Sequence, residues 1–282
     1  MSIATIDDVR RLEATAERFE TPCGDGSMVW RRFGAGHDRE PLILLHGGSG
    51  SWTHWVRTIP DLAQDHEVWV ADLPGLGDSA MPAKPPVPEN SADAVVHGIR
   101  TLVPAERRPR LVCFSFGAHV GTFAAGRLGA HIRAMTIIGT SALGIRRPTM
   151  VFPKEHSAMT HAEALGVHRK VLELLMLSRP DRVDDLAVAL QADNVRKARF
   201  RSRPFAATDN VRQGLAHVSV PLTTIWGRKD VVGYPTVEAC LDILREHHPE
   251  LVAEIIPDAG HWVMYEQPHV FNAALRRMLA LH

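Results

Sequence analysis

Excess charge of either sign, cysteine and long apolar runs are all scarce in this sequence. Lysine plus arginine (32) equal aspartate plus glutamate (32), so the chain has no electrostatic reason to bind nucleic acid or an anionic membrane surface. The longest apolar runs, such as residues 218–226, are too short and too interrupted to span a bilayer. The N-terminal segment lacks the apolar core of a signal peptide, and we therefore expect a cytoplasmic protein.

The few cysteines and the many histidines both argue against a metal site. Cys23, Cys113 and Cys240 are odd in number and widely spaced, which excludes a disulfide framework and a cysteine cluster for zinc. The sixteen histidines are mostly isolated, and none forms the HExxH pattern of helical zinc sites. We therefore expect neither a metal nor an organic cofactor, and we interpret most histidines as surface residues or hydrogen-bonded core residues.

Strand-like and helix-like patterns alternate along most of the chain. After a short helix at residues 2–12, runs at residues 14–20 and 27–33 are separated by turn residues and predict an antiparallel hairpin. The apolar runs that follow are typical of strands buried on both faces, and they occur at residues 41–45, 67–71, 110–114, 133–138, 220–226 and 251–256. Helical patterns lie between these runs, at residues 52–64, 91–103, 116–128, 237–246 and 267–281. The alternation predicts an α/β fold with a mostly parallel central sheet and helices on both faces.

The alternation stops between residues 142 and 214. This stretch is rich in arginine, methionine and histidine and has no buried strand pattern, while helices are plausible at residues 161–176 and 183–192. The simplest interpretation is an α/β core in two parts, residues 1–141 and 215–282, interrupted by a helical lid at residues 142–214. Such a lid would lie over the carboxyl edge of the sheet, where open α/β sheets bind their ligands.

The strongest local signal for chemistry is Ser115. An apolar strand runs into this serine, and a helix with small residues follows it directly. A nucleophile on such a strand-to-helix turn needs small neighbours two positions away on each side, because the turn is tight. Gly117 fits the downstream position, and Cys113 occupies the upstream position where glycine is usual. We predict that Ser115 is a nucleophile rather than an ordinary helix N-cap, and that Cys113 is a buried, inert thiol.

A serine hydroxyl needs a base, and the base needs a carboxylate that orients it. His261 follows a short glycine turn after the predicted strand at residues 251–256, and Asp230 follows the strand at residues 220–226. Both therefore reach the carboxyl edge of the sheet. Asp258 is the competing carboxylate, but it precedes His261 so closely that we expect it to form the turn. We predict His261 as general base and Asp230 as its acidic partner.

The glycine-rich segment His46-Gly47-Gly48-Ser49-Gly50 follows the first buried strand. Its glycines let the backbone approach a bound acyl group, and its N–H groups can face a developing oxyanion. We predict that the backbone N–H groups of Gly48 and Phe116 form an oxyanion hole. His46 is interpreted as a structural residue that holds the loop.

Five residues are candidates for the substrate pocket. Ser49 belongs to the glycine-rich loop, and Trp52 just after it could line the pocket entrance, whereas Trp55 is expected in the core. Trp262 is interpreted either as a pocket wall or as core filling. Arginines of an arginine-rich run could meet a substrate carboxylate or form surface ion pairs; they include Arg196 and Arg199.

These features resemble the α/β-hydrolases over nearly the whole chain. The resemblance rests on the glycine loop at residues 46–50, the loop Asp-Leu-Pro-Gly-Leu-Gly-Asp-Ser at residues 72–79, the turn at Ser115, the segment 226–230 and Gly260-His261-Trp262. Within that superfamily the chain is most similar to meta-cleavage-product hydrolases, which cut carbon–carbon bonds of aromatic ring-fission products, and to related esterases and lactonases. Trp262 and the segment 193–200 are the residues most similar to the carbon–carbon hydrolases.

Two departures narrow what the resemblance implies. The carbon–carbon hydrolases commonly carry Gly-Asn before the nucleophile, where this chain has Cys113-Phe114, so the asparagine that helps to bind a dienoate is missing. Ester or lactone hydrolysis is therefore open beside carbon–carbon cleavage. A serine at position 115 argues against haloalkane dehalogenase and epoxide hydrolase chemistry, which needs a carboxylate nucleophile.

The sequence thus predicts a serine hydrolase that acts on a small-molecule carbonyl compound through an acyl-enzyme. The alternatives are a meta-cleavage-product hydrolase specifically, a hydroxynitrile lyase using the same triad, and a non-catalytic small-molecule binder on the same fold. The expected partner is the small-molecule substrate, and the sequence allows a homodimer. We expect the lid residues, 142–214, to determine which substrate is bound.

Overall fold

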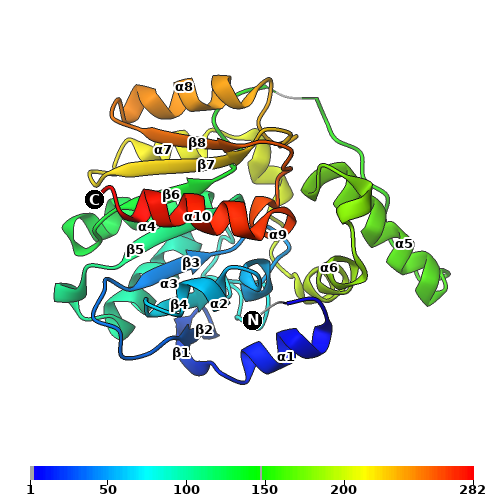
Figure 1. The fold of residues 1–282 in the computed structure, drawn as a ribbon, viewed down its shortest axis with the longest axis horizontal. Coiled ribbons are helices and arrows are strands. Elements are labelled where there is room, and N and C mark those ends of the chain that lie inside the picture. Colours follow the sequence, from blue (N-terminus) through cyan, green and yellow to red (C-terminus); the bar gives the residue numbers. More distant parts are fainter. Residues whose placement is uncertain (1–2, 147) are drawn as a thin grey trace.

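A single eight-stranded sheet organises the computed structural model, which describes residues 3–146 and 148–282 (Figure 1). The strand order is β1-β2-β4-β3-β5-β6-β7-β8. Pairing is antiparallel between β1 and β2 and between β2 and β4, and parallel from β4 to β8. The strands are β1 Glu17–Cys23, β2 Gly26–Phe33, β3 Leu42–Leu45, β4 Val68–Ala71, β5 Arg110–Phe114, β6 Met135–Ile138, β7 Leu222–Gly227 and β8 Val252–Ile256. The opening hairpin and the mostly parallel sheet confirm the prediction from the sequence.

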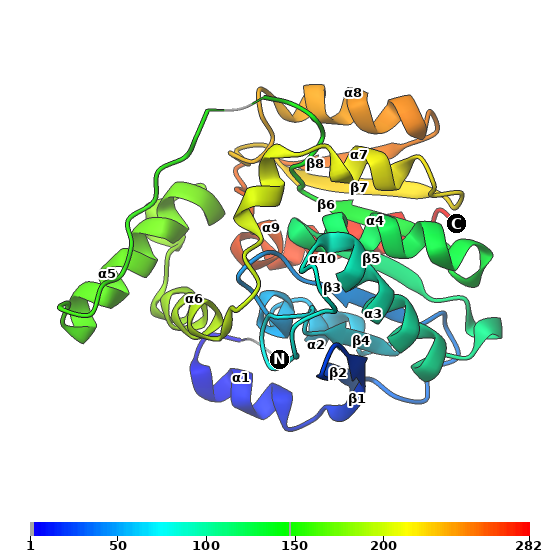
Figure 2. The same cartoon turned by 180° about the vertical axis from the view of Figure 1, so that it is seen from behind.

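Helices cover both faces of the sheet. Figure 1 shows α10 and α2 in front of the strands, and Figure 2, seen from behind, shows α3, α4 and α7 on the other face. The helices of the core and its edges are α1 Ile6–Glu13, α2 Ile59–Leu62, α3 Pro88–Leu102, α4 Phe116–Leu128, α7 Asn210–Leu215, α8 Val237–His247, α9 Val263–Glu266 and α10 Pro268–Leu279. Each face encloses its own apolar cluster, and every residue of β3 and β4 is buried because helices cover both sides of these strands.

One of the helices expected in the core is divided in the structure. The apolar spacing of residues 52–64 predicts one helix, but the chain forms a 3-10 turn, η1 Trp52–Trp55, and then α2. Pro60 lies in the first turn of α2, where a backbone N–H has no partner within the helix, so proline is favourable at this position. A new helix therefore begins there. The helix expected at residues 267–281 forms as α10, and Pro268 in its first turn separates it from the short α9, which the sequence did not predict.

The chain between β6 and β7 contains helices and no strand within its described residues. Its elements are α5 His161–Val171, the π-helical turn η4 Leu172–Met176, the 3-10 turns η5 Pro180–Arg182 and η6 Arg203–Ala207, α6 Asp185–Lys197, and α7. Figures 1 and 2 both show α5 and α6 beyond one end of the strands, with α5 projecting away from the sheet. α7 instead packs on α4, where Gly214 lies against Thr122.

α6 is five residues longer at its C-terminal end than the predicted helix at residues 183–192. Asp184 caps its start by accepting a hydrogen bond from the N–H of Ala187 (2.8 Å). Its last turn contains Asn194 and Lys197, and no glycine or proline interrupts it. None of the helices in the described ranges has the length and hydropathy that a membrane span needs.

Candidate active site

Ser115 lies in a tight turn between β5 and α4. Its φ of 51° and ψ of −117° are unfavourable for a residue with a side chain, a strain of about 1–3 kcal/mol. The surroundings enforce this backbone: the Ser115 N–H donates to the carbonyl groups of Ile138 (3.0 Å) and Gly139 (2.9 Å). A Cβ atom at Gly117 would collide with the carbonyl oxygen of Leu45, so α4 can start this close to β3 only with glycine there. The turn therefore exposes the serine hydroxyl above the sheet edge.

Cys113 replaces the usual upstream glycine because Gly121 makes room for it. The thiol of Cys113 is fully buried, and a Cβ atom at Gly121 would collide with its sulfur. Burial raises the pKa of the Cys113 thiol far above its ordinary value, so the thiol stays protonated. The side chain thus packs β5 against α4.

We expect Gly121→Ala to lower the free energy of unfolding by about 1–3 kcal/mol, because the added methyl group overpacks the contact with Cys113. The double variant Cys113→Ala/Gly121→Ala should regain most of this loss, since the sulfur is gone. Gly166→Ala in α5 is the matched control: nothing lies within 4 Å of its new methyl group, so better helix propensity should stabilise it slightly. Urea denaturation measures all four chains, and equal stability of the two single variants would contradict the packing argument.

The structure brings Ser115, His261 and Asp230 together. The Oγ of Ser115 lies 2.8 Å from Nε2 of His261, and Nδ1 of His261 lies 2.9 Å from Oδ2 of Asp230. His261 is 3% exposed and Asp230 is 5% exposed, whereas Ser115 is partly exposed. In this geometry the carboxylate accepts Nδ1–H, which leaves Nε2 free to accept the serine proton.

Asp230 and its competitor Asp258 lie in different environments. The other oxygen of Asp230, Oδ1, accepts the N–H of Val232 (2.8 Å), so the carboxylate is fixed from both sides. Asp258 lies in the turn before the histidine with a φ of 52°, and its exposed side chain pairs with Lys229 (2.7 Å). Lys229 holds the pKa of Asp258 below its ordinary value. Of these two carboxylates, Asp230 is the one that bonds to the imidazole.

Gly139 provides space for the Asp230–His261 pair. It follows β6 with a φ of 40°, and a Cβ atom there would lie 2.5 Å from Oδ2 of Asp230 and 3.2 Å from Nδ1 of His261. Any side chain at this position would displace the carboxylate or the imidazole. The sequence pattern did not identify Gly139, because the residue carries no functional group.

The two predicted oxyanion donors are neighbours. A Cβ atom at Gly48 would lie 3.5 Å from the Cβ of Phe116, the residue that begins α4 next to Ser115. Within residues 3–146 and 148–282, neither N–H group donates a hydrogen bond to another protein group. Both donors are therefore available to an oxygen bound beside Ser115.

Two buried histidines hold the glycine loop from inside. His46 donates through Nδ1 to the carbonyl of Gly47 (2.7 Å), and its Nε2 accepts the N–H of Leu73 (2.9 Å). His54 accepts the N–H of Gly47 at Nδ1 (3.2 Å). Burial lowers the pKa of both imidazoles, so both act as neutral hydrogen-bonding groups. The pattern indicated a structural His46, but gave no sign of His54.

The proposed pocket residues are not all near Ser115. Ser49 is partly exposed at the crest of the glycine loop, with a φ of 48°. Trp262 is 1% exposed, donates its indole N–H to the carbonyl of His54 (2.9 Å) and stacks on Tyr265, as a core residue does. Trp52 is buried and lines a separate cavity of about 310 Å³ that none of the three residues Ser115, His261 and Asp230 borders.

The two arginines bond to groups outside the site of Ser115, His261 and Asp230. Arg196 pairs with Asp193, and its side chain is 71% exposed. Arg199 donates to the carbonyl of Ser79 in the loop at residues 72–79. In this structure both therefore form contacts at the surface of α6 and its following turn.

The chain after α6 contributes residues beside the serine that the sequence pattern missed. Ser202 is buried against Gly48, and the ring of Phe200 packs on that of Phe116 with 5.2 Å between ring centroids. Phe205 stacks on Phe200 in turn. Apart from the Ser202 hydroxyl, the residues named here form an aromatic wall. Among the described residues, no group of three or more histidine, cysteine, aspartate or glutamate side chains is arranged to hold a metal ion.

Comparison with known proteins identifies the type of fold. The model of the Alpha/beta hydrolase family matches residues 42–274. The chain is 27% identical to 2-hydroxy-6-oxo-6-(2'-aminophenyl)hexa-2,4-dienoic acid hydrolase of Metapseudomonas resinovorans, over 93% of this chain and 90% of that protein. It is 25% identical to the dihydrolipoyllysine-residue acetyltransferase component of the acetoin cleaving system of Pseudomonas putida, over 92% of this chain and 68% of that protein. The structure of naproxen esterase from Bacillus subtilis superposes with a TM-score of 0.73 at 18% identity, over 97% of this chain and 96% of the other, and so shares the fold.

Proposed function

The chain belongs to the alpha/beta hydrolase family, and we propose that it is a serine hydrolase of small-molecule esters or lactones, with Ser115 as nucleophile. The observation that carries the proposal is the continuous hydrogen-bond chain from Ser115 through His261 to Asp230. In a fold that hosts many chemistries, function must be argued from such a site rather than from the fold. The esterases and hydrolases among the similar proteins agree with it.

The proposed reaction is a two-step acyl transfer. The hydroxyl of Ser115 attacks the substrate carbonyl carbon while Nε2 of His261 takes its proton, and Asp230 stabilises the imidazolium that results. The N–H groups of Gly48 and Phe116 bind the oxyanion of the tetrahedral intermediate. His261 then gives the proton to the leaving alcohol, and a water molecule repeats the sequence on the acyl-enzyme to release the acid. Loss of one oxyanion donor would lower kcat by roughly 100- to 1,000-fold.

Hydrolysis of a carbon–carbon bond in a ring-fission product is the second candidate. The 27% identity to the dienoic acid hydrolase favours it. Such a vinylogous diketone must be converted to its keto form before Ser115 can attack. Phe114 stands where the resemblance to carbon–carbon hydrolases implies asparagine, and its ring centroid lies 4.9 Å from that of His261. A phenyl ring cannot hydrogen-bond a dienoate, and for this reason ester or lactone hydrolysis ranks first.

A fluorophosphonate probe and a substrate panel test the proposal. We expect the probe to label Ser115 alone, as read by peptide mass spectrometry, and we expect turnover of p-nitrophenyl acetate or of a lactone. Turnover of a dienoate ring-fission product alone would shift the assignment to the second candidate. Cyanide release from mandelonitrile without ester turnover would indicate a hydroxynitrile lyase. A chain that neither reacts with the probe nor turns over any substrate would be a binder, and the proposal would fail.

A further inference from the structure

Within the described residues, hydrogen bonds hold the oxyanion loop, residues 46–50, at its start, whereas Gly48 is held by packing against Ser202. His46 and His54 hold Gly47 from the core side. Gly48 and Ser49 follow, and both are partly exposed. The position of the Gly48 N–H therefore depends on Ser202 and on where the next residues, 51–53, are held.

α6 holds residues 51–53 through one buried amide. The Oδ1 atom of Asn194 accepts the hydroxyl of Ser51 (2.7 Å), and its Nδ2 donates to Oγ1 of Thr53 (3.0 Å). Asn194 is 1% exposed, Ser51 4% and Thr53 8%. Ser51 in turn caps η1 by accepting the N–H of Thr53 (3.2 Å). A helix from the segment between β6 and β7 is thus bonded to the residues next to the oxyanion loop.

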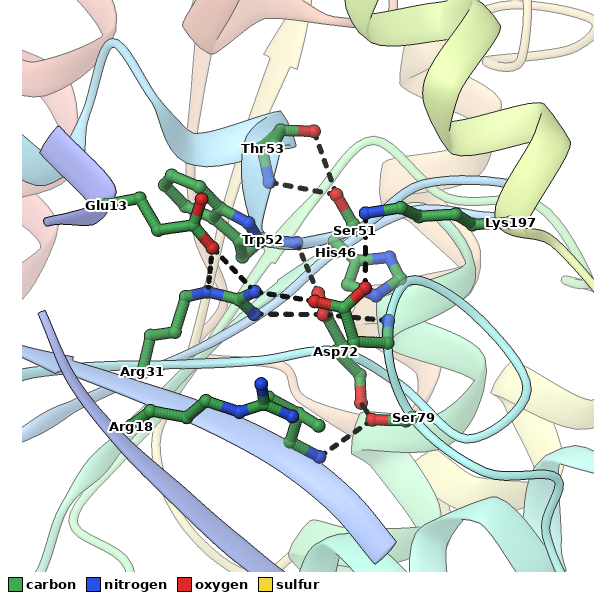
Figure 3. A network of polar contacts seen from close by, with 12 residues as sticks. Glu13, Arg18, Arg31, His46, Ser51, Trp52, Thr53, Asp72, Ser79 and Lys197 are labelled. Atoms are coloured by element: carbon green, nitrogen blue, oxygen red, sulfur yellow. Dashed lines mark hydrogen bonds and ion pairs between the residues drawn. The ribbon is translucent and has the colours of Figure 1, made fainter. Parts of the chain in front are cut away.

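A second connection runs through charged groups at the same place (Figure 3). Asp72, which is fully buried, accepts the N–H of Trp52 (2.8 Å) and pairs with Arg31 (3.0 Å). Arg31 also pairs with Asp78 (2.7 Å), and Asp78 pairs with Lys197 of α6 (3.1 Å). Burial works to raise the pKa of Asp78, but the bonds from Arg31 and Lys197 outweigh it and keep the pKa low. Asp78 therefore stays charged at neutral pH.

Of the two connections, the amide is the stronger. Lys197 is a third exposed, so water and salt screen its ion pair and its contribution is small. The hydrogen bonds of Asn194 are shielded from water, and their loss would leave the hydroxyls of Ser51 and Thr53 without this partner. Apolar packing cannot replace these hydrogen bonds, because a cavity of about 310 Å³ lies between α1, α6 and residues 51–53.

We propose that Asn194 is a positioning residue for hydrolysis, through which α6 holds the oxyanion loop so that the Gly48 N–H faces Ser115. The inference rests on the proposed function. When α6 is docked, the amide holds residues 51–53 and the oxyanion donor is in place. When the amide is lost, the loop shifts and the donor is misplaced, although the serine, histidine and aspartate are untouched. Misplacement by about 1 Å can lower a rate by up to roughly 100-fold.

The test compares Asn194→Ala with the control Val195→Ala on the same helix, whose side chain is 39% exposed. With p-nitrophenyl acetate, we expect Asn194→Ala to lower kcat and kcat/KM together by roughly tenfold, as for an interaction made only in the transition state. The affinity for 2,2,2-trifluoroacetophenone, whose adduct with Ser115 carries an oxyanion, should weaken by the same factor. The control should match the parent chain in both measurements.

Thr53→Val removes the other side of the same contact and carries the test if Asn194→Ala does not fold. We expect it to give part of the same loss, because the bond between Ser51 and Asn194 remains, and we expect the double variant to be no worse than Asn194→Ala, since that variant already lacks the contact with Thr53. Parent-like kcat and inhibitor affinity in both single variants, or additive losses in the double variant, would overturn the inference. A parent chain without turnover and without inhibitor binding would instead overturn the proposed function, and the inference with it.

Discussion

Replacing Ser115 with alanine should lower kcat for p-nitrophenyl ester hydrolysis by about 10⁴-fold or more, with circular dichroism and the unfolding midpoint unchanged. The loss is large because the acyl-enzyme cannot form without the hydroxyl that lies 2.8 Å from His261. What activity remains would come from binding and the oxyanion donors alone. Stopped-flow or steady-state release of p-nitrophenol measures it.

Ser91→Ala is the matched control for this variant. Ser91 lies on α3, is fully buried, and its hydroxyl has no hydrogen-bond partner within the described part of the chain. Its removal should leave kcat unchanged. Full esterase activity in Ser115→Ala would falsify the assignment of the nucleophile, whereas equal losses in the two variants would point to a general effect of losing a buried hydroxyl.

Replacing Asp230 with asparagine should lower kcat by about 10⁴-fold without unfolding the protein. An asparagine of the same shape can still accept the Val232 N–H, so the turn after β7 should persist. Its amide, however, would donate to Nδ1 of His261 and favour the tautomer with the proton on Nε2. That nitrogen could then no longer accept the proton of Ser115.

Asp258→Asn is the control for the loss of a negative charge near His261. Asp258 is exposed and pairs with Lys229, so its variant should keep the parent kcat to within about twofold. If Asp258→Asn were the inactive variant and Asp230→Asn the active one, Asp258 would be the acidic partner. A pH–rate profile of Asp230→Asn adds a second readout of the histidine.

The strands and helices of the core could be predicted from the sequence, because buried apolar residues recur there in continuous runs or at helical spacing. β5 and α4 match their predicted bounds, since an apolar run ends abruptly at Ser115 and a helical pattern starts at the next residue. The prediction of one helix at residues 52–64 was wrong. The spacing of apolar residues does not show that a new helix begins at a proline. The extension of α6 to Lys197 was missed because polar residues carry no apolar period.

The same distinction applies to the site. Ser115, His261 and Asp230 could be selected because each follows a strand and carries a reactive group. Asn194 could not, since it lies 143 residues from Ser51 and shares no local pattern with it. Gly139 was missed for the opposite reason, because a glycine carries no chemical signal at all.

The close approach of Asp230 and His261 to Gly139 limits which residues this protein can accept there. A lineage that acquired any bulkier residue there would keep every reactive group of the enzyme and still lose their alignment. We therefore expect an active protein to accept no residue larger than glycine at this position, although a chemical probe of the reactive groups would not identify it. A mutational scan that measures activity at every position would identify it.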